Sequence, residues 1–425
     1  MSASSAADLA AIDIASAQLY ERDGIPHEAF GLLRRHDPVH WHPWDNQRGG
    51  FWAVTTRADL TTVTRDWQTY TSEQHVNLWE LDAEAQAARR SLIESDGPDH
   101  VRLRRLVTQP FTLRRMSGYH DATRAIVDEL LDDAIGAGDC DAVKALSEPL
   151  PIRVIVSILG VPSADGEFLV QLSNQLVEGT SAETLDPHAY GNTTPLDLLP
   201  FNSPAAHALF EFGRAVGAER RACPADDLVS KLVTANVDGD QLSDTEFCNF
   251  FQLLVFAGNE TTRTAISNGL LAFMQFPDQL ERLHADPSLI PTAVEEIIRW
   301  ATPVLHMRRT ATTDTELHGV AISEGEWAVL WYASANFDEL AFDDPMRFDV
   351  GRPVKPDHVA FGSFGPHHCL GAPLARLELR LLLEQIVARG VRMTQSAPVV
   401  RVRSNFVNGI VSLPCRLTAG NRRNT

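Results

Sequence analysis

The chain of 425 residues lacks the features that mark several large classes of protein. It has five cysteines, at positions 140, 223, 248, 369 and 415, and no Cys-x-x-Cys pair. An odd number at irregular spacing argues against a disulfide framework and against a zinc ribbon. No apolar run has the length that spans a bilayer, and the first residues lack the basic segment and apolar core of a secretory signal. We therefore expect a cytoplasmic protein without a membrane anchor, whose cysteines stay reduced.

Positive charge is also scarce. The chain has 37 Lys and Arg against 56 Asp and Glu, a net charge of −19, which argues against nucleic-acid binding. One stretch departs from this balance, because five arginines and no acidic residue lie between positions 102 and 115: Arg102, Arg104, Arg105, Arg114 and Arg115. If Arg376 or Arg380 lies beside them, such a surface would attract an acidic partner. The alternative is that some of these arginines bind the carboxylates of a ligand and the rest are solvated.

What is present begins with one cysteine in a glycine-rich loop, Phe361-Gly-Ser-Phe-Gly-Pro-His-His-Cys-Leu-Gly371. A helix is predicted to follow at once, because Pro373 suits a first helical turn. Cys369 would then lie just ahead of a helix N-terminus, where the helix dipole favours negative charge. The thiolate is the form of cysteine that binds metal, and we interpret Cys369 as an iron ligand.

The clearest helix is predicted from the capping box Ser243-Asp-Thr-Glu246 to about Met274. Its apolar run is interrupted by Ala257-Gly-Asn-Glu-Thr-Thr262. The Thr261 hydroxyl is expected to bond to the Ala257 carbonyl and to bend the helix. The bend would place Glu260 beside Thr261 in a groove, a pair that can pass protons to a bound ligand. The alternative, favoured if the run is taken alone, is a helix that surfaces here with Glu260 in water.

The rest of the chain predicts a mainly helical protein with a small β portion, a single domain over residues 1–425 with a loose lead-in at 1–20. Another helix carries Glu296 and Arg299, which alone would be an ordinary surface ion pair. The expected strands and breaks are a hairpin at 39–44 and 51–56, a long connection at 186–204, strands at 304–310, 316–322 and 327–332, and a final hairpin of 399–403 with 410–416.

The Cys loop, the helix break and the Glu-x-x-Arg pair occur in one order, and together they resemble the cytochrome P450 superfamily of haem-thiolate monooxygenases. The resemblance covers nearly the whole chain. It implies a haem b buried between the long central helix and the Cys-loop helix, with Cys369 as the iron ligand. The implied cofactor-binding residues are His100, Arg104, Ala257, Arg309, Phe364, Gly365, His367, Cys369 and Gly371. It also implies that Glu260 and Thr261 are catalytic and that Glu296, Arg299 and Arg352 hold the fold.

The chain departs from the family pattern in two places. An aromatic residue is expected seven positions before the cysteine, where this chain has Gly362. Phe361 and Phe364 compete for its place beside the sulfur, as though Ser363 were inserted, and we favour Phe364 because it is closer in sequence. The usual proline of a Phe-x-Pro-x-Arg stretch is Val350 here, from which we expect little consequence.

The resemblance implies an enzyme that inserts one oxygen atom of O2 into a lipophilic small molecule. The pocket is predicted from a mostly apolar set: Leu253, Phe256, Ala257, Val304, Leu305, Phe406 and Val407. The helix break and the tail at 403–410 resemble bacterial members that hydroxylate steroids, terpenoids and branched lipids. Aromatic hydrocarbons, oxidative coupling and, in another class, a haem-based ligand sensor are the alternatives. Electrons are expected from NAD(P)H through a ferredoxin reductase and a ferredoxin.

Overall fold

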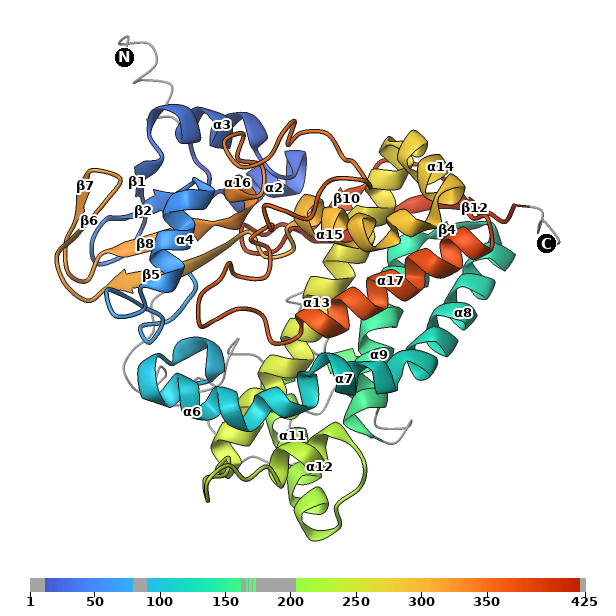
Figure 1. The fold of residues 1–425 in the computed structure, drawn as a ribbon, viewed down its shortest axis with the longest axis horizontal. Helices are drawn as coiled ribbons and strands as arrows, with labels where there is room; N and C mark the ends of the chain where they lie inside the picture. The colour runs from blue at the N-terminus through green and yellow to red at the C-terminus, as the bar shows by residue number, and fades with distance from the viewer. Residues whose placement is uncertain are drawn as a thin grey trace.

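The computed structural model of the protein describes residues 12–78, 90–161, 166, 168, 169, 171, 172 and 204–420. Residues 1–11 of the expected lead-in and 186–203 of the expected connection lie outside the described residues. The prediction of a mainly helical chain with a small β portion is confirmed (Figure 1). None of the described helices combines the length and the apolarity that crossing a bilayer requires.

The described helices form most of the molecule. The α-helices are α2 (Ala17–Asp23), α3 (His27–His36), α4 (Arg57–Arg65), α6 (Gly97–Thr108), α7 (Leu113–Met116), α8 (His120–Ala137), α9 (Pro149–Leu159), α11 (Pro204–Ala222), α12 (Leu228–Val233), α13 (Asp244–Gln275), α14 (Pro277–Ala285), α15 (Ile290–Ala301), α16 (Tyr332–Ala335) and α17 (Ala372–Ala388). Shorter turns are η1 (Leu92–Glu94), η2 (Gln109–Phe111), η3 (Ser117–Tyr119), the π-helical η4 (Val143–Ser147) and η7 (Pro287–Leu289).

The described strands form one five-stranded sheet, in the order β1-β2-β8-β5-β3, and three smaller ones, β10-β11, β4-β12-β9 and β6-β7. The strands are β1 (Val39–Pro43), β2 (Gly50–Val54), β3 (Tyr70–Thr71), β4 (Asp139–Asp141), β5 (His306–Ala311), β6 (Thr315–Leu317), β7 (Val320–Ile322), β8 (Trp327–Trp331), β9 (Arg392–Gln395), β10 (Val400–Arg401), β11 (Ile410–Ser412) and β12 (Pro414–Thr418). The large sheet and the helices α8, α9 and α17 lie on opposite sides of α13 in Figure 1.

Two strand predictions were wrong in detail. The single strand expected at 316–322 is a hairpin of β6 and β7, because His318 and Gly319 take positive φ angles of 53° and 78° and turn the chain. The final hairpin exists as β10 with β11, but residues 414–416 do not belong to it. They begin β12, which pairs with β4 and β9 instead. The first error is a missed local turn, while the second concerns pairing with distant strands, a choice that local sequence does not make.

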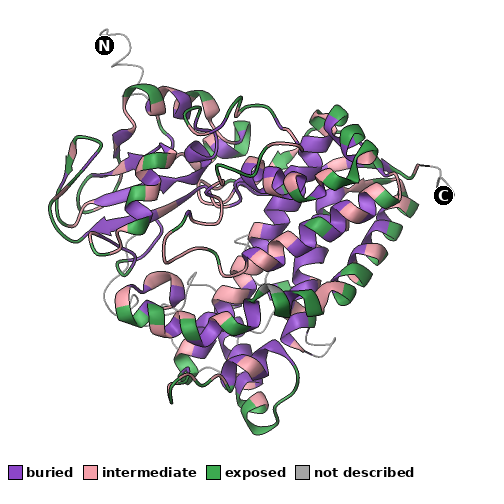
Figure 2. Cartoon of the chain, in the orientation of Figure 1, coloured by how far each residue is buried: buried purple, intermediate pink, exposed green. Residues whose placement is uncertain are grey.

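Helix α13 begins at the predicted capping box. The Ser243 side chain accepts from the Glu246 N–H, and the Glu246 carboxylate accepts from the Ser243 N–H. The helix continues to Gln275 and is buried along most of its length, as Figure 2 shows, because α9, α11 and α15 pack around it. A Cβ at Gly258 would lie 2.8 Å from Ile155 Cδ1, so the glycine permits the close approach of α9.

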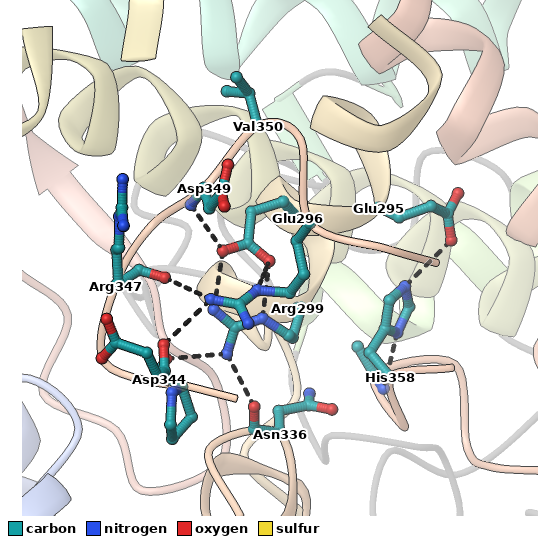
Figure 3. Close-up of polar contacts among 12 residues, drawn as sticks. Glu295, Glu296, Arg299, Asn336, Asp344, Arg347, Asp349, Val350 and His358 are labelled. Atoms are coloured by element: carbon teal, nitrogen blue, oxygen red, sulfur yellow. Dashed lines mark hydrogen bonds and ion pairs between the residues drawn. The ribbon is translucent and has the colours of Figure 1, made fainter. Parts of the chain in front are cut away.

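Glu296 and Arg299 are buried rather than exposed, so the expectation of an ordinary surface ion pair is wrong. Arg299 Nε and Nη2 donate to the two Glu296 oxygens at 2.7 and 2.8 Å, and Arg352 Nε donates to Oε2 at 3.0 Å (Figure 3). The Asp349 N–H also donates to Glu296, at 3.0 Å. The carboxylate therefore ties α15 to the chain segment around residue 350.

Val350, in the position of the family's proline, takes part in the same segment. Its N–H donates to Gln279 Oε1 at 3.2 Å, and its carbonyl accepts from Thr292 Oγ1 at 2.6 Å. Proline has no N–H and would leave Gln279 without this donor. The departure from the family pattern thus has a structural consequence here, contrary to the expectation from sequence.

Replacing Arg299 by Ala should lower the free energy of unfolding by about 3–5 kcal/mol, because Glu296 would stay buried without its main partner. The midpoint of urea denaturation measures this. Arg380→Ala is the matched control, since the Arg380–Glu384 pair is exposed and should contribute about 0.5 kcal/mol or less. Equal shifts of the denaturation midpoint in the two variants would show that burial of the Glu296–Arg299 pair does not increase its contribution to stability.

Candidate functional site

A cavity lies between α13 and the loop that precedes α17. Five residues of α13 were expected in a pocket or a proton path: Leu253, Phe256, Ala257, Glu260 and Thr261. All but Phe256 and Glu260 line the cavity. The other predicted residues that line it are Arg104, Val304, Arg309, His367, Cys369 and Gly371. The structure thus brings the cysteine, the helix break and three basic side chains to one space, from segments more than 250 residues apart.

The Cys loop has a fixed backbone. The Cys369 N–H donates to the Phe361 carbonyl at 2.9 Å, and the His368 N–H donates to the Gly365 carbonyl at 3.2 Å. Arg104 Nη2, from α6, donates to the His368 carbonyl at 2.7 Å. Helix α17 starts at Ala372, with Pro373 in its first turn as predicted. Cys369 is therefore held directly before a helix N-terminus.

The sulfur of Cys369 is exposed to the cavity, while protein surrounds it on its other sides. Burial raises the pKa of the Cys369 thiol, although the N–H groups of Gly371 and Ala372 and the charges of Arg104 and Arg376 act in the opposite direction. The helix end thus acts in the expected direction and favours the thiolate, but burial outweighs it. A metal cation changes this balance, because a coordinating thiol is deprotonated outright.

The preference for Phe364 as the aromatic residue beside the sulfur is not supported. Half of the Phe364 surface is exposed, and the residue does not line the cavity. Phe361 lines the cavity with Cys369 instead, and its ring lies 4.6 Å from the guanidinium carbon of Arg376. Gly362 and Ser363, between the two rings, take positive φ angles of 88° and 54°, so the backbone turns between Phe361 and Phe364.

An acidic residue fixes His367 at the edge of the cavity. His367 Nε2 lies 2.9 Å from Asp96 Oδ1 and 3.2 Å from Ser72 Oγ. The other Asp96 oxygen accepts from Thr71 Oγ1 and from the Ser72 N–H. Burial raises the pKa of Asp96, but these hydrogen bonds, that of His367 first, outweigh burial and lower it. The carboxylate therefore stays charged and orients the imidazole.

Two further basic residues beside His367 lack partners for part of their polar surface. The His100 ring lies 4.4 Å from that of His367, and in the part of the chain that the structure describes its buried Nε2 has no hydrogen-bond partner. Burial, followed by the charges of His367 and Arg104, lowers the pKa of His100 to about 4. Arg309 is buried, and the one hydrogen bond described for its guanidinium goes to the Arg308 carbonyl at 2.8 Å.

These residues fit a haem. The cavity wall is apolar over most of its area, as a flat porphyrin requires, with a cysteine on one side. Burial lowers the pKa of the Arg104 and Arg309 guanidinium groups, and carboxylates at this edge would supply charge-assisted bonds that favour their charge. His100, Arg104, Arg309 and His367 would hold the two propionates. Cys369 would bind the iron, and Gly371 leaves space beside its sulfur, since a Cβ there would lie 3.9 Å from Sγ.

On α13 the expected bond between Thr261 Oγ1 and the Ala257 carbonyl is present, at 2.7 Å, and the helix continues through it. The alternative of an exposed run is wrong, because Glu260 and Thr262 are both buried. Thr261 lines the cavity, but Glu260 does not. Its carboxylate lies 3.4 Å from Thr264 Oγ1, and a Cβ at Gly409 would lie 3.3 Å from it. The acid and the alcohol therefore lie on different faces of α13.

Four predicted pocket residues, Phe256, Leu305, Phe406 and Val407, do not line the cavity. The segment 406–407 pairs with 304–305: the Leu305 N–H donates to the Phe406 carbonyl, and Val304 and Val407 form a β-bridge. Leu305 belongs to the core beside the large sheet. Gly365 is also outside the cavity, and it allows the loop to approach α4, where its Cβ would lie 2.2 Å from the Thr64 carbonyl oxygen.

Several lining residues were missed from the sequence. Leu92 and Ile93 lie in a stretch of the sequence without a clear apolar period, and Ile155 lies in an apolar segment that carries no motif. Met307 had a usable signal, since it lies two residues before Arg309 on β5, and residues two apart share one face of a strand. The other missed lining residues could be identified only from the tertiary structure.

The chain is similar in sequence to a known family and to several of its members. The cytochrome P450 family model matches residues 15–390. The chain is 36% identical over 396 residues to a steroid C26-monooxygenase of Mycolicibacterium smegmatis, covering 91% of this chain and 89% of the relative. It is 35% identical over 417 residues to a methyl-branched lipid omega-hydroxylase of Mycobacterium tuberculosis, covering 96% and 94%.

Solved structures that resemble this chain are also cytochromes P450. A Mycobacterium marinum cytochrome P450 in complex with pseudoionone is 39% identical, with a TM-score of 0.83 over 96% of this chain and 98% of that one. A Novosphingobium aromaticivorans cytochrome P450 is 31% identical, also with a TM-score of 0.83, over 96% and 97%. The chain belongs to the cytochrome P450 family of haem monooxygenases.

Proposed function

We propose that the protein inserts one oxygen atom of O2 into a terpenoid, a steroid or a branched lipid, with electrons delivered by a ferredoxin. One observation carries the proposal: Cys369 and Thr261 line the same apolar cavity, with basic residues for carboxylates at its edge. A haem bound through a thiolate supplies the activation of dioxygen. The cavity residues bind and orient the substrate and exclude water.

The reduced, CO-bound protein should show the red-shifted Soret band of a thiolate-ligated haem. Cys369→Ser should remove this band, because the thiolate is lost, and Cys248→Ser is the control, since Cys248 is a buried cysteine of α13 that does not line the cavity. A spectrum without the band in the wild-type protein would contradict a haem-thiolate enzyme. It would instead favour the haem-based ligand sensor.

Proton delivery is assigned to the two faces of α13. The Thr261 hydroxyl reaches the cavity and can hold a hydrogen bond to a ligand there, while retaining the Ala257 carbonyl as a second partner. Glu260 lies on the face of α13 that is directed toward Gly409 and Thr264. It would receive protons on that face and pass them around the helix to the cavity side. A buried carboxyl group in this position suits general acid catalysis.

Thr261→Ala should still bind haem and substrate but should divert most reducing equivalents to peroxide, because the hydroxyl in the cavity is removed. The ratio of product to consumed NAD(P)H measures this coupling. Thr261→Ser is the matched control and should stay within about twofold of wild type, since the hydroxyl is retained. Equal coupling in all three proteins would remove Thr261 from the proton path.

The cavity wall and the relatives support the proposed substrate class. Leu92, Leu253, Leu254, Val304 and Met307 present aliphatic surface, which favours a lipophilic molecule. The similar proteins are named for steroid and methyl-branched lipid oxidation, and one similar structure holds pseudoionone. A screen for the low-to-high-spin shift on ligand addition would separate these classes from aromatic hydrocarbons and from the partners of oxidative coupling.

The structure divides the five arginines that predicted an acidic electron donor. Arg104 lines the cavity, while Arg102 and Arg105 form ion pairs with Glu246 and Asp238. Arg114 and Arg115 of α7 are exposed, and α7 packs against α17, the helix that follows Cys369. These two arginines therefore lie on the side of the molecule from which a ferredoxin would approach Cys369. The cytoplasmic location stays a prediction.

Reversal of both charges, Arg114→Glu with Arg115→Glu, should slow electron transfer from an acidic ferredoxin about tenfold at low salt and much less at high salt, because salt screens exposed charges. Stopped-flow reduction under CO gives the rate. Arg105→Glu should have a smaller effect, since Asp238 already neutralises Arg105. Rates that do not depend on Arg114 and Arg115 would remove α7 from the approach path.

A further inference from the structure

A carboxylate of α15 holds a cation beside the Cys loop. Glu295, the neighbour of Glu296, accepts from Arg376 Nε at 2.6 Å and from Arg376 Nη2 at 2.8 Å, a bidentate contact that links α15 to α17. Only 18% of the Glu295 side chain is exposed. Bidentate pairs of this kind are the strong form of the carboxylate–guanidinium contact. Glu295 therefore fixes where the positive charge of Arg376 lies.

His358 reaches the same carboxylate from the segment just before the Cys loop (Figure 3). Its Nε2 lies 3.2 Å from Glu295 Oε2, while its Nδ1 accepts from the Ala360 N–H at 3.3 Å. A ring nitrogen that accepts carries no proton, so the imidazole is neutral and its Nε2–H donates to Glu295. Burial raises the pKa of Glu295, but the hydrogen bonds of Arg376 and His358 outweigh burial and lower it to about 2. At neutral pH the three side chains thus carry one negative and one positive charge.

The Arg376 guanidinium lies against the aromatic ring that borders the cavity. Its carbon is 4.6 Å from the centroid of the Phe361 ring, and the Phe361 carbonyl accepts from the Cys369 N–H. Phe361 lines the cavity with Cys369, but Arg376 does not. The charge of Arg376 nevertheless acts on the Cys369 sulfur, in the direction that favours its negative form. Arg376 is therefore a cation outside the cavity whose electric field reaches the sulfur.

A charge in this position bears on electron uptake. Reduction of a haem adds one electron to a site that would already hold a thiolate, so an uncompensated cation nearby would favour the reduced form. Glu295 places the opposite charge on the same guanidinium, and the partial burial of the pair limits screening by salt. Removal of either charge would change the reduction potential of the haem, and the two removals would act in opposite directions.

We propose that Glu295 is a positioning residue for the cofactor: it holds Arg376 against Phe361 and offsets the effect of the Arg376 charge on the reduction potential of a haem bound through Cys369. The proposal rests on the proposed function, which requires that haem. A residue with only a structural role would change stability when it is replaced. A residue that offsets a charge would also change the potential, with a sign that the lost charge determines.

The test is a spectroelectrochemical titration of the haem-loaded full chain with dithionite and dye mediators, without a protein donor. Glu295→Gln should favour the ferrous form about tenfold, a rise of about 59 mV in the midpoint potential, because the Arg376 charge is left uncompensated. Arg376→Gln should shift the equilibrium about as far in the opposite direction, because Glu295 keeps its negative charge. The double variant should lie within about twofold of the wild-type equilibrium, since both charges are gone.

Glu384→Gln and Arg380→Gln are matched controls, because they remove the same charges from an exposed pair further along α17. Neither should change the equilibrium more than about twofold, since solvent screens exposed charges. Urea denaturation shows whether each variant is folded, and the CO spectrum after chemical reduction shows whether it keeps the thiolate band. If Glu295→Gln does not fold, Arg376→Gln decides alone: a lower potential supports the proposal, and an equal or higher one contradicts it.

Unchanged potentials in Glu295→Gln and Arg376→Gln, with the thiolate band intact, would overturn this proposal and leave the proposed function standing. Shifts of the same sign in both variants would also overturn it, because they would indicate lost packing around Phe361 rather than a pair of offsetting charges. A wild-type spectrum without the thiolate band would contradict the proposed function, and this proposal with it.

Discussion

The position of the Cys loop depends on a buried carboxylate about 70 residues earlier in the chain. Glu296 holds the guanidinium of Arg299, and Arg299 Nη1 in turn donates to the Asn336 carbonyl at 2.8 Å. The Asn336 side chain accepts from the Val359 N–H at 2.7 Å, two residues before the Cys loop, and donates to Thr302 Oγ1 at 2.9 Å. Figure 3 shows the centre of this network. A buried ion pair is weak evidence for stability, but this pair specifies where a loop without regular secondary structure begins.

The two walls of the cavity are built by different kinds of interaction. The loop wall is held by hydrogen bonds, from Asn336, from Arg104 and from α4, and it carries the cysteine. The α13 wall is held by packing of α9, α11 and α15 around a helix that is buried along most of its length. This division suits the proposed chemistry, because a cysteine that binds iron would need a fixed direction while the substrate side would need apolar surface. At the edge where the two walls meet, the basic side chains would bind the carboxylates of a haem.

The sequence was sufficient for features that neighbouring residues determine. The capping box of α13, the start of α17 and the bond from Thr261 to Ala257 all lie within four residues of chain. It was insufficient where contacts with distant segments determine which way a side chain points or which strands pair. Glu260 turns toward Gly409, Leu305 faces the core beside the sheet, and β12 pairs with β4, because of contacts more than 100 residues apart. The family pattern supplied the site residues, but it did not show which faces they would occupy.

Ser363, the extra residue of the Cys loop relative to the family pattern, separates the part of the loop that faces the cavity from the part that faces solvent. On the inner side, the bond from the Cys369 N–H to the Phe361 carbonyl and the place of Phe361 in the cavity wall are kept. On the outer side, Ser363 and Gly365 fill the space against Thr61 and Thr64 of α4, and the added length projects Phe364 into solvent. Residues 363–365 therefore shape the surface of the protein, while Phe361 and Cys369 shape the cavity. The loop can tolerate a new exposed side chain because α4, rather than the cofactor side, takes up the change in backbone path.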